Sequence, residues 1–251
     1  MQSTVYPNLD SQHVLVTGGA TGIGADIVRS FAEQNCLVTI FDIQDDAGQD
    51  LADQLGQSTQ YVHCDLLDTD TTQTQVHSIA KQRGALSVLV NNAANDDRRP
   101  IENIDADYWD WSQRINVGSQ FFVAQAAYRS MKTLKKGSVI NLSSIAWRLG
   151  IAELAAYATA KAGILGLTQS LAREFGQHNI RVNAIEPGAV MTTKQRSLWY
   201  PTDADVERMV NRQMLDRVIV GEDIARVVVF LASDDSAAIT GQSIRVDSGF
   251  Q

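Results

Sequence analysis

Residues 13–24 read HVLVTGGATGIG: an apolar run, a corner with glycine at positions 18, 22 and 24, and the start of a helix-like segment. Glycine lets the backbone turn tightly and approach a bound group closely, and the amides at a helix N-terminus attract a pyrophosphate. The spacing is looser than the dinucleotide pattern G-x-G-x-x-G, and a glycine-rich corner alone is often only a turn. This stretch therefore predicts a strand-turn-helix unit, with Gly18, Gly22 and Gly24 as a candidate dinucleotide site.

A second apolar run, LVTIF at 37–41, ends on Asp42. In dinucleotide-binding folds an acidic residue near this distance accepts hydrogen bonds from the adenine-ribose hydroxyls, and its charge repels a 2′-phosphate. No Arg or Lys lies between Gly18 and Gly24 or directly after Asp42 to bind that phosphate. NAD is therefore favoured over NADP, with the alternative that Asp42 is an ordinary turn former at a strand end.

Short β-branched runs alternate with longer helical patterns along the whole chain, without a linker. After the first two, they occupy 60–64, 87–91, 137–142, 180–185 and 243–246. Buried strands separated by helices indicate a parallel sheet covered on both faces, and right-handed connections make it doubly wound. We predict an α/β Rossmann-type single domain over 1–251 with about seven strands. Residues 192–216 break the rhythm and suit either a substrate lid or a decorative insertion.

The composition agrees with such a domain. The chain has 251 residues, 44% hydrophobic and 20% charged, which is enough to bury a full core. Its net charge of -8 argues against nucleic acid and against an anionic membrane as partners. Cys36 and Cys64 fall at interior positions without metal-ligand spacing, so we expect reduced thiols and no metal site. Residues 1–12 are polar and no apolar run approaches about 18 residues, which predicts a soluble, cytoplasmic protein.

Tyr157 and Lys161 stand four residues apart in the run YATAK, so on a helix they share a face. A phenol titrates near 10, and ionising it two to three pH units lower needs about 3 to 4 kcal/mol. One cation about 4 Å away supplies that at an effective dielectric of about 20. The pair can therefore make a proton acceptor in which Lys161 lowers the pKa of Tyr157, although such pairs are usually mere surface neighbours.

Ligands of open parallel sheets bind beyond the carboxyl ends of the strands. The residues that follow the predicted strands are Asp65, Asn91-Asn92-Ala93-Ala94, Ser143-Ser144 and Pro187-Gly188. TGGATGIG at 17–24, NNA at 91–93, a Ser upstream of Tyr-x-x-x-Lys, and Pro187-Gly188 stand in the order found in the short-chain dehydrogenase/reductase family. The chain resembles this family over essentially its whole length.

The resemblance implies four catalytic residues. Tyr157 would take a proton from an alcohol, Lys161 would lower its pKa and hold the nicotinamide ribose, and Ser144 would orient the reacting oxygen. Asn116 would anchor a water that links Lys161 to solvent. Such a set supplies acid/base tuning and fixed geometry, while the cofactor carries the hydride chemistry. Ser143 is the rival of Ser144, and Asn116 has the alternative of a helix-interior Asn that bonds the backbone.

The resemblance also implies a set of NAD contacts along the carboxyl ends of the strands. Its members are Gly18, Thr21, Gly22, Ile23, Gly24, Asp42, Ile43, Asp65, Leu66, Asn92, Ala93, Ala94, Tyr157, Lys161, Pro187, Gly188, Val190 and Thr192. For Asp65 and Asn92 the alternative is that they cap helices or brace turns.

The positions that the family leaves variable are polar in this chain. Besides Ser144 and Tyr157, the residues expected to contact substrate are Asn95, Trp147, Arg148, Glu186 and Trp199. Hydrogen-bonding groups beside flat aromatic rings suit a polyhydroxylated substrate better than a steroid or a long acyl chain. Glu186 stands where an apolar or small residue is more usual, and by hypothesis its carboxylate accepts a sugar hydroxyl. The alternatives are that residues 96–99 are a solvated charge run and that Trp147 is packing.

Residues 91–98, 144–150 and 194–201 resemble the bacterial NAD-dependent aldose 1-dehydrogenases. That resemblance implies hydride transfer from C1 of an aldose, a pentose or related sugar, to NAD, which gives the lactone. A second reading is reduction of a 3-oxoacyl thioester or another carbonyl, with a docking patch for an acidic carrier at Arg129, Lys132, Lys135 and Lys136. A third is a cofactor-sensing protein without catalysis, although such proteins usually lack a catalytic residue and this chain retains all four.

Assembly is the last property that the resemblance implies. It suggests a homotetramer with the helices expected at 153–175 and 108–131 at an interface. Small residues line the first of these from Ala155 to Gly166 and allow close approach to a cofactor or to another subunit.

Overall fold

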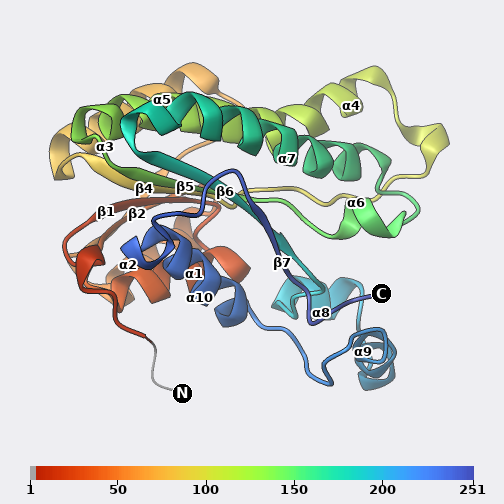
Figure 1. Ribbon diagram of the computed structural model, residues 1–251. Coiled ribbons are helices and arrows are strands. Elements are labelled where there is room, and N and C mark those ends of the chain that lie inside the picture. Colours follow the sequence, from red (N-terminus) through yellow and green to blue (C-terminus); the bar gives the residue numbers. More distant parts are fainter. Residues whose placement is uncertain (1–3) are drawn as a thin grey trace.

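The strands form one parallel sheet. A computed structural model describes residues 4–251, and its seven strands pair in the order β3-β2-β1-β4-β5-β6-β7 (Figure 1). They are β1 (His13–Thr17), β2 (Leu37–Asp42), β3 (Thr59–His63), β4 (Leu86–Asn91), β5 (Gly137–Leu142), β6 (Ile180–Pro187) and β7 (Ser243–Val246). All neighbouring strands run parallel. The predicted doubly wound sheet is confirmed, and the predicted runs differ from the observed strands only at their ends.

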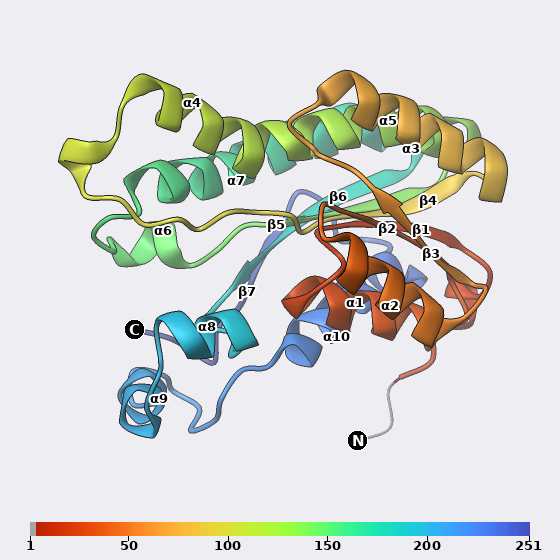
Figure 2. The ribbon, with the colours of Figure 1, turned by 180° about the vertical axis from the view of Figure 1, so that it is seen from behind.

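Helices cover both faces of this sheet (Figures 1 and 2). One face carries α3 (Thr69–Arg83), α4 (Ala106–Gln113), α5 (Ser119–Leu134) and α7 (Ala155–Phe175), and the other carries α1 (Gly22–Ala32), α2 (Asp45–Leu55) and α10 (Gly221–Ala232). The shorter helices α6 (Ala146–Leu149), α8 (Thr193–Leu198) and α9 (Asp203–Val210) follow the carboxyl ends of β5 and β6. Across residues 4–251, no helix is at once long and apolar enough to span a membrane.

Alternate residues of the central strands pack against opposite helix layers. Val14 and Val16 of β1 belong to the core that includes residues of α1 and α10, whereas Leu15 belongs to the core with α3, α5 and α7. This period of two, on a strand buried on both faces, explains why the run is apolar without a break. Cys36 and Cys64 lie one in each core as buried free thiols, as predicted.

The helix expected over 108–131 is interrupted by a π turn at Arg114–Gly118, between α4 and α5. Asn116 in this turn is fully buried. Its Nδ2 donates to the carbonyl oxygens of Ser112 and Asn95, both at 3.0 Å, and its Oδ1 accepts from the Asn95 amide at 2.9 Å. A side chain thus enters the hydrogen-bond ladder of the helix and ties it to the chain that follows β4.

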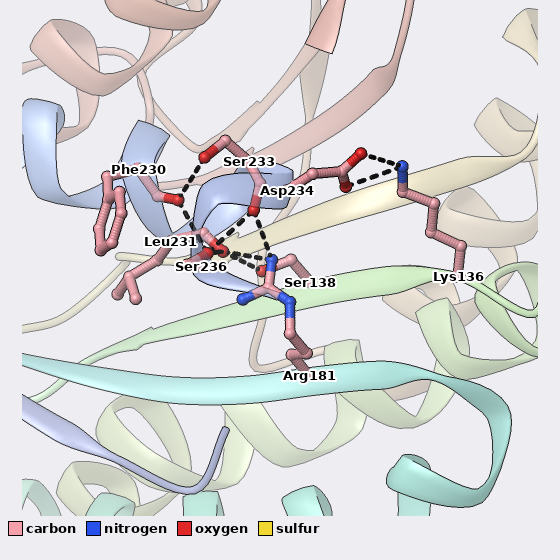
Figure 3. A network of polar contacts seen from close by, with 8 residues as sticks. All are labelled: Lys136, Ser138, Arg181, Phe230, Leu231, Ser233, Asp234 and Ser236. Carbon is pink, nitrogen blue, oxygen red and sulfur yellow. Dashed lines mark hydrogen bonds and ion pairs between the residues drawn. The ribbon is translucent and has the colours of Figure 1, made fainter. Parts of the chain in front are cut away.

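A polar network lies at the amino end of the sheet, where β5 and β6 begin (Figure 3). Arg181 of β6 donates to the carbonyl oxygens of Leu231 (2.7 Å) and Ser233 (3.1 Å), and Ser138 of β5 donates to Leu231 as well (2.8 Å). The last carbonyls of α10 have no donor within the helix, and these side chains supply one. The network therefore anchors α10 to β5 and β6 and serves the fold.

Candidate active site

A cavity of about 1150 Å³ opens at the carboxyl ends of the strands. Every residue predicted to contact NAD lines it, namely Gly18, Thr21, Gly22, Ile23, Gly24, Asp42, Ile43, Asp65, Leu66, Asn92, Ala93, Ala94, Tyr157, Lys161, Pro187, Gly188, Val190 and Thr192. They come from the ends of five strands and from α7, because parallel strands deliver the residues after them to one edge. Direct contact of each with a cofactor stays a prediction.

The glycine corner after β1 is formed by close backbone approach. Gly18 has a φ of +62°, and a Cβ there would lie 2.7 Å from the Cα of Ala93. A Cβ on Gly24 would overlap the carbonyl oxygen of Gly18. Side chains at these positions would collide with the backbone, so glycine lets the corner pack closely against the chain after β4. The corner also lines the cavity at the N-terminus of α1, where backbone amides fit the pyrophosphate of a dinucleotide.

Asn92 and Asp65 brace the turns beside this corner. The Asn92 Nδ2 donates to the carbonyl oxygens of Gly18 (2.7 Å) and Thr17 (3.1 Å), and the Asp65 Oδ1 accepts from the Leu67 amide (3.0 Å). The turn-bracing alternative is therefore confirmed for both residues. Both residues also line the cavity, so this turn-bracing role does not exclude their predicted contact with cofactor.

Asp42 is buried at the end of β2, with both carboxylate oxygens hydrogen-bonded. Its Oδ2 accepts from the amide of Ala20 (3.0 Å), and its Oδ1 accepts from the amides of Ile43 (2.8 Å) and Gln44 (3.1 Å). Asp42 thus shapes the turn and also presents its charge to the cavity. Gln44, which the sequence did not single out, lines the cavity beside it and donates to the Thr21 hydroxyl (3.2 Å).

Tyr157 and Lys161 lie on the side of α7 that faces the cavity. The Lys161 side chain is buried, its Nζ donates to the Leu142 carbonyl at 2.8 Å, and it lies 5.5 Å from the centre of the Tyr157 ring. Ser144 makes a side-chain hydrogen bond with Tyr157, whereas the Ser143 hydroxyl donates to the backbone carbonyl of Lys161 at 2.7 Å. Ser144, and not Ser143, is therefore the serine that faces the phenol.

The electrostatics of this pair differ from the prediction. Burial raises the pKa of Tyr157 and the Asp96 carboxylate adds to the rise, while the hydrogen bond with Ser144 lowers it. Burial also lowers the pKa of Lys161 to about 7, against an opposing effect of Asp96. The net shift of the Tyr157 pKa is thus upward, and a lowering by Lys161 itself stays a prediction. The rise is caused by desolvation, which disfavours the charged form of both groups.

Asn116 lies behind the cavity and does not line it. Its amide holds the backbone of Asn95, which does line the cavity, so the helix-interior alternative that bonds the backbone is the arrangement found. The role of Asn116 in anchoring a water stays a prediction.

The residues predicted to contact substrate divide into two groups. Asn95, Ser144 and Tyr157 line the cavity, whereas Trp147, Arg148, Glu186 and Trp199 do not. Trp199 instead stacks under the Arg98 guanidinium, whose Cζ is 3.5 Å from the ring centre. The cavity therefore gives no support for direct substrate contact by the second group.

Glu186 is fully buried, and its carboxylate is already occupied. Arg148 donates to it through Nε (2.8 Å) and Nη2 (3.0 Å), Trp147 through Nε1 (2.9 Å) and Ser243 through its hydroxyl (2.6 Å). Burial alone would raise the pKa of Glu186, but these donors hold it below its ordinary value. The hypothesis that Glu186 accepts a sugar hydroxyl is therefore wrong: the carboxylate ties α6 to β6 and β7. Trp147 is a packing residue, which was the alternative given for it.

Some residues that line the cavity were not among the predicted site residues. They are Asp96 and Arg98 after β4, and Gln195, Tyr200, Arg212 and Phe250 from the segments after β6 and β7. The Arg212 guanidinium lies over the Phe250 ring, 4.6 Å from its centre. The only sequence signals for these additional cavity residues were the polarity of residues 95–99 and the aromatic side chains in the 192–216 segment.

Comparisons with known proteins agree with this arrangement. Residues 18–251 match the family model described as "Enoyl-(Acyl carrier protein) reductase". The chain is 42% identical to the "Probable galactose dehydrogenase GalD" of Rhizobium meliloti (strain 1021), over 99% of this chain and 98% of that protein. It is 39% identical to the D-xylose 1-dehydrogenase of Caulobacter vibrioides (strain NA1000 / CB15N), over 100% of both.

Two further comparisons are with a reductase and with a solved structure. A 3-oxoacyl-[acyl-carrier-protein] reductase of Chlamydia trachomatis serovar D is 36% identical over 96% of this chain and 98% of its own. A crystal structure from Sinorhizobium meliloti 1021, named a "putative short-chain alcohol dehydrogenase", superimposes with a TM-score of 0.89 at 34% identity, covering 96% of this chain and 98% of that one. With matches of this length and identity, the chain belongs to the short-chain dehydrogenase/reductase family of oxidoreductases.

Proposed function

We propose that this protein oxidises C1 of a cyclic aldose, with NAD as the hydride acceptor, and releases the aldonolactone. The full-length identity of 42% and 39% to two proteins named for sugars carries the proposal. A cavity that joins the glycine corner to Tyr157, Ser144 and Lys161 supports it, because the acid/base group and the dinucleotide site open into one space.

Three residues of the cavity can assist this reaction. Tyr157 acts in its deprotonated form: the phenolate oxygen takes the proton of the C1 hydroxyl and becomes the phenol, while the Ser144 hydroxyl donates a hydrogen bond to the C1 oxygen. Lys161, in its protonated form, places a positive charge beside the phenol and binds ribose hydroxyls. When bound, the nicotinamide supplies the acceptor for the hydride that leaves C1. With the proton and the hydride gone, the C1–O single bond becomes the carbonyl of the lactone.

Asp42 supports NAD as the cofactor. Its buried carboxylate lines the cavity and accepts three backbone hydrogen bonds, which hold it in one orientation. A fixed negative charge at this place accepts ribose hydroxyls and repels a 2′-phosphate.

The test is a turnover assay with purified protein. NAD or NADP is combined with pentoses, hexoses and simple secondary alcohols, and the reverse reaction is run with a 3-oxoacyl thioester. Absorbance of the reduced nicotinamide is followed. We expect NAD-dependent oxidation of aldoses with lactone as the product. Activity only with the thioester and NADPH would contradict the proposal, and so would cofactor binding without any turnover.

A second candidate, reduction of a 3-oxoacyl thioester, is favoured by the 36% identical reductase and by the description of the family model. The patch suggested for carrier docking argues against it. Arg129 and Lys132 lie in the last turns of α5, which leads into the start of β5, and Lys136 pairs with Asp234 at 3.0 Å. The patch is therefore at the amino end of the sheet, and a carrier docked there is on the wrong side of the molecule for the cavity.

We also infer a homotetramer that buries α4, α5 and α7. Trp109 of α4 is 38% exposed, and Phe121 and Phe122 of α5 are each 37% exposed, which leaves large apolar side chains on this layer in the single chain. Light scattering on the eluting protein should give four times the chain mass. A monomer across the working concentration range would contradict this assembly.

A further inference from the structure

The loop at 95–99, which follows β4, is anchored on the side away from the cavity. The Arg99 amide donates to the Glu153 carbonyl at 2.9 Å, and its guanidinium lies 3.8 Å from the centre of the Tyr108 ring. Asp97 pairs with Arg99 at 3.1 Å. The loop is therefore fixed to α4 and to the segment before α7.

On its other side the same loop holds α8 at both ends. Asp96 Oδ1 pairs with the Lys194 ammonium at 2.5 Å, and Asp96 Oδ2 accepts from the Gln195 side-chain amide at 3.2 Å. At the far end, Arg98 stacks on Trp199. The alternative of a solvated charge run at 96–99 does not hold for Asp96 and Arg98, which have partners on α8 and Trp199, whereas Asp97 is exposed and pairs with Arg99 inside the run.

Asp96 is the acidic member of this loop that faces the reacting groups. It lines the cavity together with Lys194 and Gln195, whereas Asp97 does not. Its side chain is only 24% exposed. Tyr157 and Lys161 line the same cavity, and the Asp96 charge raises the pKa of each. A substrate whose C1 oxygen meets Tyr157 would thus have Asp96 within reach of its neighbouring atoms.

We propose that Asp96, Lys194 and Gln195 form a hydroxyl-binding subsite that selects substrates with a further hydroxyl group near the reacting carbon. This inference rests on the proposed function and adds the residues that read the sugar. A hydroxyl can donate to the Asp96 carboxylate and accept from the Lys194 ammonium or the Gln195 amide, so it joins the cluster with every polar group paired. A hydrogen or methyl at that position leaves a charged pair facing an apolar group, which disfavours the substrate.

The experiment crosses enzyme variants with substrate variants. Wild type, Asp96→Asn and Asp97→Asn are assayed with D-xylose and D-galactose and with monodeoxy analogues of each. For wild type we expect that removing one particular hydroxyl lowers kcat/KM about tenfold to a hundredfold, the size of a hydrogen bond to a charged group. In Asp96→Asn this penalty should shrink toward onefold, chiefly through KM. Asp97→Asn is the matched control and should keep the full penalty.

The outcomes separate the inference from the proposed function. If wild type oxidises no aldose, both fail. If wild type oxidises aldoses but Asp96→Asn keeps every deoxy penalty of wild type, only the subsite fails. NADH binding and thermal melting report whether each variant is folded. Should Asp96→Asn not fold, Lys194→Gln takes its place. The Lys194 side chain is 56% exposed, so its replacement disturbs the fold little, and the substitution removes the positive charge of the pair. The same penalty should then shrink, and an unchanged one overturns the subsite.

Discussion

The Nζ atom of Lys161 lies 2.8 Å from the carbonyl oxygen of Leu142, the last residue of β5. This contact fixes a long, flexible side chain to the edge of the sheet from which Ser144 also extends. Burial nevertheless lowers the pKa of Lys161 to about 7, so the ammonium is held in position but is close to losing its proton at neutral pH. The charge next to Tyr157 therefore depends on what else enters the cavity.

Replacement of the phenol should abolish catalysis while leaving the cofactor site intact. We expect Tyr157→Phe to lower kcat by about 10² to 10⁴, the usual size of lost acid/base catalysis, with NADH binding close to wild type. Tyr128→Phe is the control, because Tyr128 stacks on Phe175 at 4.3 Å between rings and does not line the cavity. Undiminished turnover in Tyr157→Phe would remove this residue from the mechanism.

Asp96→Asn should also shift the pH profile. The groups that face Tyr157 are Lys161 on its own helix, Asp96 from the loop after β4 and the Ser144 hydroxyl. Asp96 raises the pKa of Tyr157 and of Lys161, so removing its charge makes the first proton of this pair easier to lose, whichever residue gives it up. The acid limb of kcat/KM should move down by about 0.5 to 1 pH unit.

The control for this shift is Asp97→Asn, which should leave the limb in place. The measurement is kcat/KM against pH at saturating NAD for the three proteins. A limb that moves upward in Asp96→Asn would contradict the direction, and equal shifts in both variants would attribute it to a general change in surface charge.

Loss of the Glu186 carboxylate should destabilise the fold. Glu186→Ala leaves Arg148, Trp147 and Ser243 without their shared acceptor, and we expect a loss of about 1–3 kcal/mol in the free energy of unfolding. Glu186→Gln keeps one acceptor oxygen and should lose less. Because the pKa of Glu186 is held below its ordinary value, this stabilisation is present at neutral pH and is lost as the pH falls through the folded-state pKa.

Urea unfolding of the three proteins measures this effect, with the exposed Glu207→Gln as control. Equal stability of Glu186→Ala and wild type would show that the four-residue cluster contributes nothing to the folded state. A rise in KM alongside the stability loss is also expected, because Leu149, the next residue of α6, lines the cavity.

Cofactor preference should depend on Asp42. In Asp42→Ala we expect the ratio of kcat/KM for NAD over NADP to fall about tenfold or more, since a charge pair about 4 Å apart is worth roughly 1 to 4 kcal/mol between water and a protein surface. Thermal melting is needed beside the kinetics, because Asp42 also accepts three backbone hydrogen bonds. An unchanged ratio in a folded variant would remove Asp42 as the determinant.

The sheet could be predicted from the sequence because its signals are local. β1 and β4 are buried along their whole length, so their runs are apolar without alternation, and the glycine corner is marked by glycine spacing within one strand-turn-helix unit. The π turn could not be predicted, because its shape depends on the contact between Asn116 and the distant Asn95 backbone.

Glu186 shows why the substrate residues were harder to predict than the catalytic ones. Its position beside Pro187 suggested a side chain that faces ligand. Only the pairing of β6 with β7 brings Ser243 to 2.6 Å, and only the fold of α6 brings Arg148 to 2.8 Å, so the carboxylate turns inward. The common face of Tyr157 and Lys161 could be predicted without such information, because residues four positions apart on one helix lie on the same side of it.

The position of β1 between β2 and β4 also has a consequence for biosynthesis. On the ribosome, β1, β2 and β3 emerge first and can pair with each other, but the other side of β1 has no partner until Leu86–Asn91 has been made. Until then Val14, Leu15 and Val16 stand at an unprotected edge, the kind of surface on which nascent chains aggregate or recruit chaperones. Slow translation before β4, or a truncation there, should therefore reduce yield more than the same event near the C-terminus.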